Sequence, residues 1–447
     1  MDRPALLAGA AAVDITPPLT IPYLGSHPQR YGAFNDIHDP LLARAVALSH
    51  GEHHLAILSV DAIGLSRDLL GPGRDFIAEL RERACRGLPL RPDAVMAAAT
   101  HAHSVPETYG ILRLWEDAAF RDWADGWCTA LADAIRLAWA DRRPAGLRLG
   151  QARVDGLNIN RRAALQTAGE AHPVDDEVVV LHFSRPEAPD IILANAACHA
   201  VTVQVQPMVS ADFPGVACRH VDMALGGARC VFLQGAAGDL NPRRGCTRDW
   251  ADVADYGRRL GEAIVQAAGD ATPADLDGVP LAAAAVTLPV ATRPLPDPAV
   301  LEREWQAVEA RLEGLPAEDP SCAGLFQQRC RLAEARRLVA FGTAPIPVEI
   351  QAMRLGPAAI VGLPGEVFCA DGLALRRRSP FTPTMVAELA NGCVGYLVPR
   401  SAWSSGGYEV GMGAWCRVAA GEAERLMEAA AALVADLTPA GTAPTGQ

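Results

Sequence analysis

The feature that most constrains the fold of this chain is an alternation of short apolar runs with longer helical patterns. The apolar runs are bounded by turn residues, which is typical of buried strands; they cover 41–49, 54–64, 94–100, 178–184, 191–200 and 230–238. Helical patterns lie between them, at 67–86, 117–140 and 250–268. This alternation predicts an α/β or α+β domain built on a large central mixed sheet.

A charged segment interrupts this pattern in the second half of the chain. Residues 298–340 are rich in Glu, Arg, Leu and Ala and are broken at Gly314-Leu315-Pro316, which predicts an inserted helical hairpin. The strand pattern resumes after it, at 349–356 and 358–365. We therefore expect a single large domain over 1–436, with 298–340 as a helical insertion. The tail 437–447 is predicted to be disordered.

The charge balance and the apolar patterning limit the partners of the chain. Its 52 acidic residues against 40 Lys and Arg give a net charge of -12, which repels phosphate backbones, so we expect no nucleic-acid partner. No apolar stretch reaches the roughly 20 residues of a membrane span, and Asp14 interrupts the apolar N-terminal run. The eleven cysteines include no CxxC pair and mostly lie in apolar runs, as reduced thiols do. We predict a cytoplasmic protein without stable membrane insertion.

Two histidines follow one of the predicted strands directly, in Thr100-His101-Ala102-His103-Ser104. On an extended chain, side chains two residues apart point the same way, so both rings can approach one centre. Neutral imidazole is the commonest metal ligand among side chains. The alternative is a pair of hydrogen-bonded histidines in a turn.

Three further candidates follow later apolar runs. His199 ends the run 191–200, Glu366 opens a predicted helix after 358–365, and Tyr396 lies in a strand-like segment. Each also has a structural reading: a satisfied core histidine, a glutamate that favours the helix dipole, and a core tyrosine. No spacing rule links these residues to one another, because they are distributed over most of the chain.

A series of short motifs does link them. In order, the chain reads DITPP, THAHS, NINR, AACHA, GAAGDLNP, PGE, ANGCVGY and YE. This series resembles the neutral/alkaline, non-lysosomal ceramidases, whose patterns run approximately DITGP, THTHSGP, NRSP, VHGT, NAGDVSPN, PGE, ANxYxxY and YEG. The resemblance extends from Asp14 to Glu409. Each motif is common by itself, but eight in one order are specific, and they imply a ceramidase-like catalytic domain over 1–436.

The resemblance implies a catalytic zinc and a set of residues around it. The positions that match the family's zinc ligands are His101, His199, Glu366 and Tyr396. The positions that match residues around the reacting amide are His103, Arg161 and Tyr408. Zinc lowers the pKa of a bound water to roughly 7, His103 can take up its proton, and the other two can donate to the oxyanion. The implied function is a zinc-dependent amidohydrolase in which zinc-bound water attacks a linear N-acyl bond.

The chain departs from the family in three places. Asn241 replaces a serine that has been considered a nucleophile, which excludes a serine acyl-enzyme there. Ser104 continues into 105–109 in place of the family's glycines, so the rim differs, and Glu107 either adds negative charge at the mouth or is a solvated surface residue. The C-terminal β-sandwich and signal peptide of secreted ceramidases are not expected. We therefore predict a smaller, more soluble N-acyl substrate.

Other functions remain open at this point. An esterase or lactonase would use the same zinc site, because the same nucleophile attacks either carbonyl. N-acylation, the reverse reaction, needs a site from which water is kept out. A metal-free binding or scaffold protein of ceramidase-like fold is a further alternative, because fold does not fix function. The oligomeric state is also open and includes a homo-oligomer.

Overall fold

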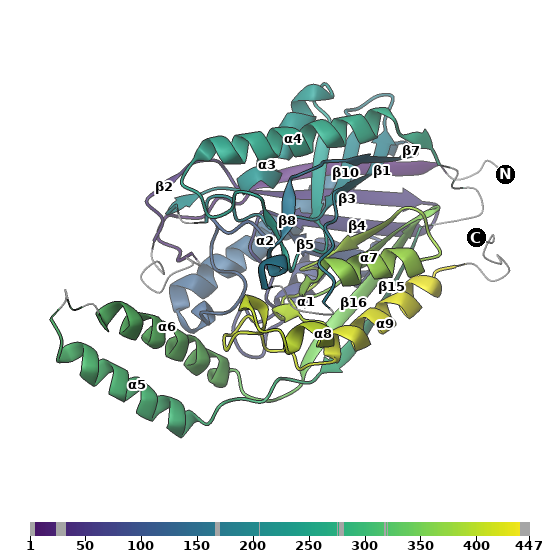
Figure 1. Ribbon diagram of the computed structural model, residues 1–447. Coiled ribbons are helices and arrows are strands. Elements are labelled where there is room, and N and C mark those ends of the chain that lie inside the picture. The colour runs from purple at the N-terminus through teal and green to yellow at the C-terminus, as the bar shows by residue number, and fades with distance from the viewer. Residues whose placement is uncertain are drawn as a thin grey trace.

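The computed structural model describes residues 5–23, 33–165, 170–204, 206–274, 276, 281–316, 319 and 321–438. Of the predicted tail, residues 439–447 lie outside this range. Within the described residues, the strands form three larger mixed sheets and three two-stranded ones. Figure 1 shows the sheets gathered at the centre, with most helices around them.

The first sheet contains most of the N-terminal strands, in the order β5-β4-β3-β1-β6. They are β1 (Leu6–Asp14), β3 (Leu42–His50), β4 (His53–Val60), β5 (Val95–Ala99) and β6 (Arg143–Pro144). Strands β4 and β5 are parallel and the other neighbours are antiparallel. Helix α2 (Ala118–Ala140) packs on its outer face, and α1 (Phe76–Cys85) packs against α2. The Asp117 carboxylate caps α2 by accepting from Ala119 N.

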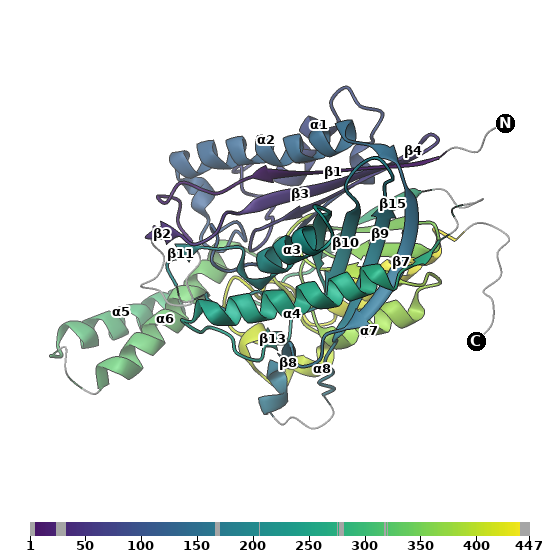
Figure 2. The ribbon, with the colours of Figure 1, turned by 90° about the horizontal axis from the view of Figure 1, so that it is seen from above.

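The second sheet has the order β12-β10-β9-β7-β14. Its strands are β7 (Gly146–Arg153), β9 (Glu177–Ser184), β10 (Ile191–Ala196), β12 (Arg229–Gln234) and β14 (Thr272–Pro273). Strands β10 and β12 are parallel, and the remaining pairs are antiparallel. Helices α3 (Asp212–Ala224) and α4 (Trp250–Gly269) pack on it, and Figure 2 shows α4 running across the outer side of β7 and β9.

The third sheet is formed by the C-terminal part of the chain, in the order β15-β16-β17-β19. Its strands are β15 (Ala282–Val290), β16 (Ile346–Leu355), β17 (Ala358–Gly362) and β19 (Thr384–Ala387). Helices α7 (Cys369–Arg378) and α9 (Glu422–Ala435) cover it through a separate apolar core. The fourth strand pairs in parallel with β17 and the others pair antiparallel.

The inner faces of the three sheets pack against one another. Ser59 Oγ on β4 donates to the Phe232 carbonyl on β12 over 2.5 Å, and Asn195 Nδ2 on β10 donates to the Val386 carbonyl on β19 over 3.0 Å. The mixed α/β fold class is therefore confirmed, whereas the single central sheet of the sequence interpretation is divided into three. The apolar runs predict strands but not their partners, which lie far away in the sequence.

The predicted helical hairpin is present. It consists of α5 (Pro298–Glu313) and α6 (Ser321–Ala340), which project from the body in Figure 1. The hairpin lies between β15 and β16, whose residues Val290 and Ile346 are paired. It has a small apolar core of its own, formed by Leu301, Val308, Leu325, Leu332 and Ala335.

Short elements complete the structure near the carboxyl ends of the main strands. They are β2 (Asp36–Ile37) with β11 (Met208–Val209), β8 (Asn158–Asn160) with β13 (Leu240–Pro242), β18 (Glu366–Val367) with β20 (Tyr396–Leu397), and helix α8 (Arg400–Trp403). None of the helices in the described part of the chain combines the length and the apolar character that crossing a bilayer requires.

Candidate metal centre and active site

His101 and His103 lie in the loop that follows β5. His101 has a φ of +63°, in the left-handed region where residues other than glycine are uncommon and which is enriched at functional sites. The prediction of an extended segment is therefore wrong at this residue. The Nδ1 atom of His101 lies 2.7 Å from the Ile63 carbonyl oxygen. Because a carbonyl only accepts, Nδ1 carries the hydrogen, and Nε2 keeps its lone pair.

His199 lies just beyond the end of β10 and is held in the same way. Its Nδ1 lies 2.7 Å from the Ala237 carbonyl oxygen, so this nitrogen also carries the hydrogen and Nε2 keeps a lone pair. Burial, with a contribution from His101, lowers the pKa of His199 to about 4. The ring is therefore neutral at pH 7, the state in which imidazole binds a metal.

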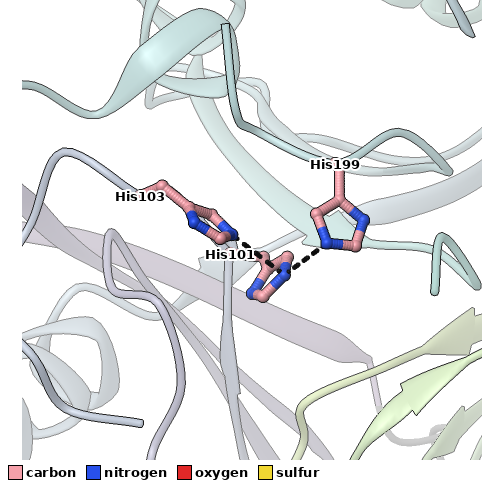
Figure 3. A group of neighbouring side chains, drawn as sticks. All are labelled: His101, His103 and His199. Atoms are coloured by element: carbon pink, nitrogen blue, oxygen red, sulfur yellow. Dashed lines mark hydrogen bonds between the residues drawn. The ribbon is translucent and has the colours of Figure 1, made fainter. Parts of the chain in front are cut away.

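The three histidine rings converge on one point, as Figure 3 shows. The Nε2 atoms of His101 and His199 are 2.9 Å apart, and Nε2 of His103 is 3.3 Å from that of His101. The ligand atoms of the three rings all lie within 4.8 Å of one another. Since both Nδ1 hydrogens are directed at carbonyls, the two Nε2 atoms can lie this close only with a shared cation between them, which is either a proton on one ring or a metal ion.

Glu366 brings a negative charge to the same point. It lies in β18, in parallel register with Tyr396 of β20, and not at the start of a helix as predicted. Its Oε2 is 3.1 Å from His199 Nε2 and 3.4 Å from His101 Nε2, and it is buried without a hydrogen-bond donor among the described residues. Burial alone would raise the pKa of Glu366, but the two histidines hold it well below its ordinary value.

These groups fit a metal ion by their chemistry. The nitrogens of His101, His103 and His199 could together hold a metal ion, and the Glu366 carboxylate and the Tyr396 phenol line the same cavity. The carbonyls that fix both Nδ1 atoms are the usual outer partners of metal-bound histidines. The structure thus brings together the four predicted ligands, with His103 beside them.

Arg161 lies beside this centre, at the end of β8. Its Nη2 donates to the Tyr396 hydroxyl over 2.9 Å, and its Nη1 donates to Asn241 Oδ1 over 3.1 Å. Its Nε donates to Glu409 over 2.7 Å, and Glu409 also accepts from the buried Arg162 over 2.6 Å. Asn241 therefore helps to hold this arginine.

Tyr408 lies on the exposed side of the same site. The residue is 57% exposed, and its ring stacks on Trp415 with the ring centroids 4.9 Å apart. The guanidinium carbon of Arg161 lies 5.7 Å from the Tyr408 ring centroid. The three residues that were assigned to the reacting amide, His103, Arg161 and Tyr408, thus surround the histidine and glutamate cluster.

The sequence analysis missed two positioning residues. The Tyr109 hydroxyl donates to Glu366 Oε1 over 2.5 Å and fixes that carboxylate at the oxygen that does not face the histidines. Glu388 is fully buried, and its Oε2 accepts from Ala237 N over 3.1 Å and from Val367 N over 2.9 Å. It therefore anchors both the residue whose carbonyl orients His199 and the residue after Glu366. Neither residue stands in a motif that marks this role.

Glu107 lies in the rim segment but not where the sequence suggested. It is fully buried and accepts hydrogen bonds from the backbone N–H groups of Gly110, Ile111 and Leu112. Burial raises its pKa, and these donors oppose the shift. Both readings from the sequence, a charge at the mouth and a solvated surface residue, are wrong. Its function is to shape the loop that carries Tyr109.

A cavity of about 650 Å³ opens over these groups. Its floor contains the histidines, Glu366, Tyr396 and Arg161, and Asn241 lies beside them. Apolar side chains form much of the wall: Ile63, Ile111, Val201, Met412 and Trp415. Helix α6 of the hairpin completes the wall with Cys330, Arg331 and Glu334. The volume is typical of a site for a small organic ligand.

Comparison with known proteins shows which solved structures share this fold. No protein-family model and no curated protein sequence match the chain. Among solved structures, neutral ceramidase from Pseudomonas aeruginosa matches with a TM-score of 0.73 and 19% identity, over 99% of this chain and 76% of that chain. A ceramidase in complex with C2 matches with a TM-score of 0.72 and 17% identity, over 99% and 77% of the two chains. The protein therefore has the fold of the neutral ceramidases.

Proposed function

We propose that this protein is a zinc-dependent hydrolase that cleaves a linear amide bond in a soluble N-acyl compound. One observation carries the proposal: the Nε2 atoms of His101 and His199 converge with a carboxylate oxygen of Glu366 in the lining of a ligand-sized cavity. Buried imidazole and carboxylate groups that face one cavity and could hold a metal ion together are typical of a catalytic site. The fold shared with ceramidases, which are amide hydrolases, supports the same assignment.

The residues around the cluster suit amide hydrolysis. When bound, zinc acts as a Lewis acid and lowers the pKa of a water molecule to roughly 7. Burial, with the neighbouring histidines, lowers the pKa of His103 well below its ordinary value, so this ring is neutral and can accept a proton. We assign to it the transfer of that proton to the leaving amine. Arg161 and Tyr408 are assigned as donors to the oxyanion.

The cavity wall supports the choice of substrate class. Asn241 offers no nucleophilic hydroxyl, so a serine acyl-enzyme at this position is excluded, and we assign the attack to a water molecule. The apolar residues Ile63, Ile111, Val201 and Met412 suit an acyl chain. A two-metal phosphatase would need more carboxylates than the single glutamate of this cluster.

The first test measures metal content together with activity. Elemental analysis of the purified wild type is expected to give about one zinc per chain, the single ion that one catalytic zinc site holds. His101→Ala is expected to lose both the metal and the hydrolysis of N-acyl amines. His53→Ala, an exposed histidine on the β3–β4 hairpin, serves as the matched control and is expected to keep both.

A substrate panel separates the related functions. N-acyl amines, ceramide and simple esters are compared at equal concentrations. Faster cleavage of N-acyl amines than of ceramide and esters supports the proposal. Ester cleavage alone would reassign the site as an esterase. A wild type that holds no zinc even after reconstitution would refute the proposal and favour a metal-free binding protein.

A further inference from the structure

The charged hairpin contributes a basic group to the wall of the cavity, which is formed largely by apolar side chains. Arg331 of α6 lines the same cavity as the histidine and glutamate cluster. Building on the proposed function, we propose that the substrate carries a carboxylate beyond its reacting amide and that Arg331 binds this carboxylate. The substrate class is then an N-acyl amino acid or a monoamide of a dicarboxylic acid.

Arg331 differs from the other charged residues that line the cavity, because each of those faces an oppositely charged or titratable partner. Arg161 is paired with Glu409 over 2.7 Å, and the Glu334 carboxylate is paired with Arg337 over 2.5 Å. Glu366 faces the histidines. Across the described ranges of the chain, Arg331 is the charged lining residue for which no ion pair or hydrogen bond is formed. Its guanidinium is thus available to a ligand.

The hairpin is fixed to the body, so this side chain has a defined place. Arg113 Nη1 donates to the carbonyl of Ala340, the last residue of α6, over 2.7 Å. The next residue, Phe341, packs edge-on against Trp115 with the ring centroids 6.3 Å apart. The guanidinium carbon of Arg417 lies 4.1 Å from the Phe341 ring centroid on the same anchor. The carboxyl end of α6 is therefore held next to the cavity.

The chemistry of arginine selects a planar anion. A guanidinium presents a fork of N–H donors that matches the two oxygens of a carboxylate. The chain as a whole has a net charge of -12 and would repel an anionic ligand at most of its surface. An unpaired arginine on the cavity wall offsets this repulsion where a ligand would enter the site. The apolar residues that line the same cavity suit the methylene chain of such a substrate.

The experiment compares three amides of similar length. N-octanoyl-6-aminohexanoate carries a carboxylate on the amine half, the monohexylamide of suberic acid carries one on the acyl half, and N-hexyloctanamide is neutral. We expect wild-type kcat/KM to be higher for one of the two carboxylates than for the neutral amide. In Arg331→Ala the ratio of kcat/KM for that carboxylate to kcat/KM for the neutral amide is expected to fall about tenfold, the typical effect of one charge-assisted pair. Most of this change is expected as a higher KM for the carboxylate. Arg331→Lys is expected to restore part of it.

A matched control removes the same charge elsewhere on the hairpin. Arg303 is exposed on α5 and does not line the cavity. The Arg303→Ala variant is therefore expected to keep the wild-type preference for the carboxylate substrate. Equal kcat/KM for the three amides in the wild type would overturn the proposal. A preference that survives in Arg331→Ala would do the same.

A binding measurement separates this proposal from the proposed function. In His103→Ala, where hydrolysis should be slow, calorimetry with the preferred carboxylate is expected to show binding that weakens about tenfold when Arg331→Ala is added, the same single-pair effect. Binding that depends on Arg331 without any hydrolysis by the wild type would retain the carboxylate site and reject the hydrolase. Hydrolysis without such dependence would reject the carboxylate site alone.

Discussion

The floor and the upper wall of the cavity are built in contrasting ways. The floor residues His101, His199 and Glu366 are almost completely buried, and each is fixed by backbone carbonyls or by a neighbouring side chain. The wall contributed by α6 belongs to a hairpin with its own small core, and its Arg331 is exposed.

The contrast indicates that metal binding and substrate selection are carried out by different parts of the structure. Groups that must hold a metal within narrow limits of distance and angle lie on the sheets, where packing fixes their rotamers. Groups that select a substrate lie on an added element that can vary without disturbing those rotamers. If this is right, substitutions in the floor affect metal binding or turnover, and substitutions in the hairpin affect KM alone. The four predictions that follow test this separation.

The largest effect is expected for Arg161→Ala. Loss of an oxyanion donor typically costs about a hundredfold or more in kcat. At saturating zinc the metal content is expected to stay at the wild-type value, because His101, His199 and Glu366 are fixed by other partners and, of the four proposed ligands, Tyr396 is the one that accepts from this guanidinium. Steady-state kinetics and elemental analysis on the same preparation test this. Loss of zinc in this variant would show that metal binding and oxyanion stabilisation are not separable.

The next effect is expected for Glu388→Ala. Removing this carboxylate frees the backbone N–H groups of Ala237 and Val367 and loosens the orientation of His199 and Glu366. Outer partners of this kind typically contribute about 10- to 100-fold to metal affinity. Competition with a zinc chelator measures the change. Glu388→Gln keeps an oxygen that can accept both bonds, and it should bind zinc more tightly than the alanine variant.

A smaller effect is expected for Tyr109→Phe. The change removes the hydroxyl that donates to Glu366 Oε1 and leaves the ring in place. We expect zinc affinity to fall about tenfold, at the lower end of the range for outer-shell groups. The same chelator titration applies. Unchanged affinity would mean that the two histidines alone fix this carboxylate.

The smallest effect is expected for Phe341→Ala in the anchor of the hairpin. The ring contributes an aromatic contact with Trp115 and a cation–π contact with Arg417, together about 1 kcal/mol. Loosening the hairpin is expected to raise KM about fivefold, the equivalent of that free energy, with unchanged zinc content. A fall in kcat or in zinc content would contradict this separation between floor and wall.

Much of the secondary structure could be predicted from the sequence because burial and periodicity are local. The runs at 94–100 and 230–238 are strands β5 and β12, and the segment 298–340 is the hairpin. Helix α3 was missed because it opens with the buried Asp212 in a left-handed conformation and contains Pro214 in its first turn. The partition into three sheets depends on pairings between distant strands, which no local pattern records.

The site could be predicted only in part, for a related reason. The motif series pointed to seven residues, and the structure places all of them around one cavity, although their individual roles stay predictions. Tyr109 contacts Glu366 across 257 residues of sequence, so its position within a rim segment carried no sign of that contact. Glu107 was misread because a glutamate in a loop is usually solvated, and here three backbone donors replace the solvent.

The pairing of Val290 with Ile346 has a consequence for how such proteins diversify. The chain leaves the sheet at the end of β15 and returns to it at the start of β16, so both ends of the hairpin join the sheet at neighbouring residues. The entropy of closing a loop grows only slowly with its length, so segments of different length or charge can be exchanged at this junction at little cost to the sheet. Homologous proteins can thus keep an unchanged active site and gain a different substrate specificity through one insertion at this junction.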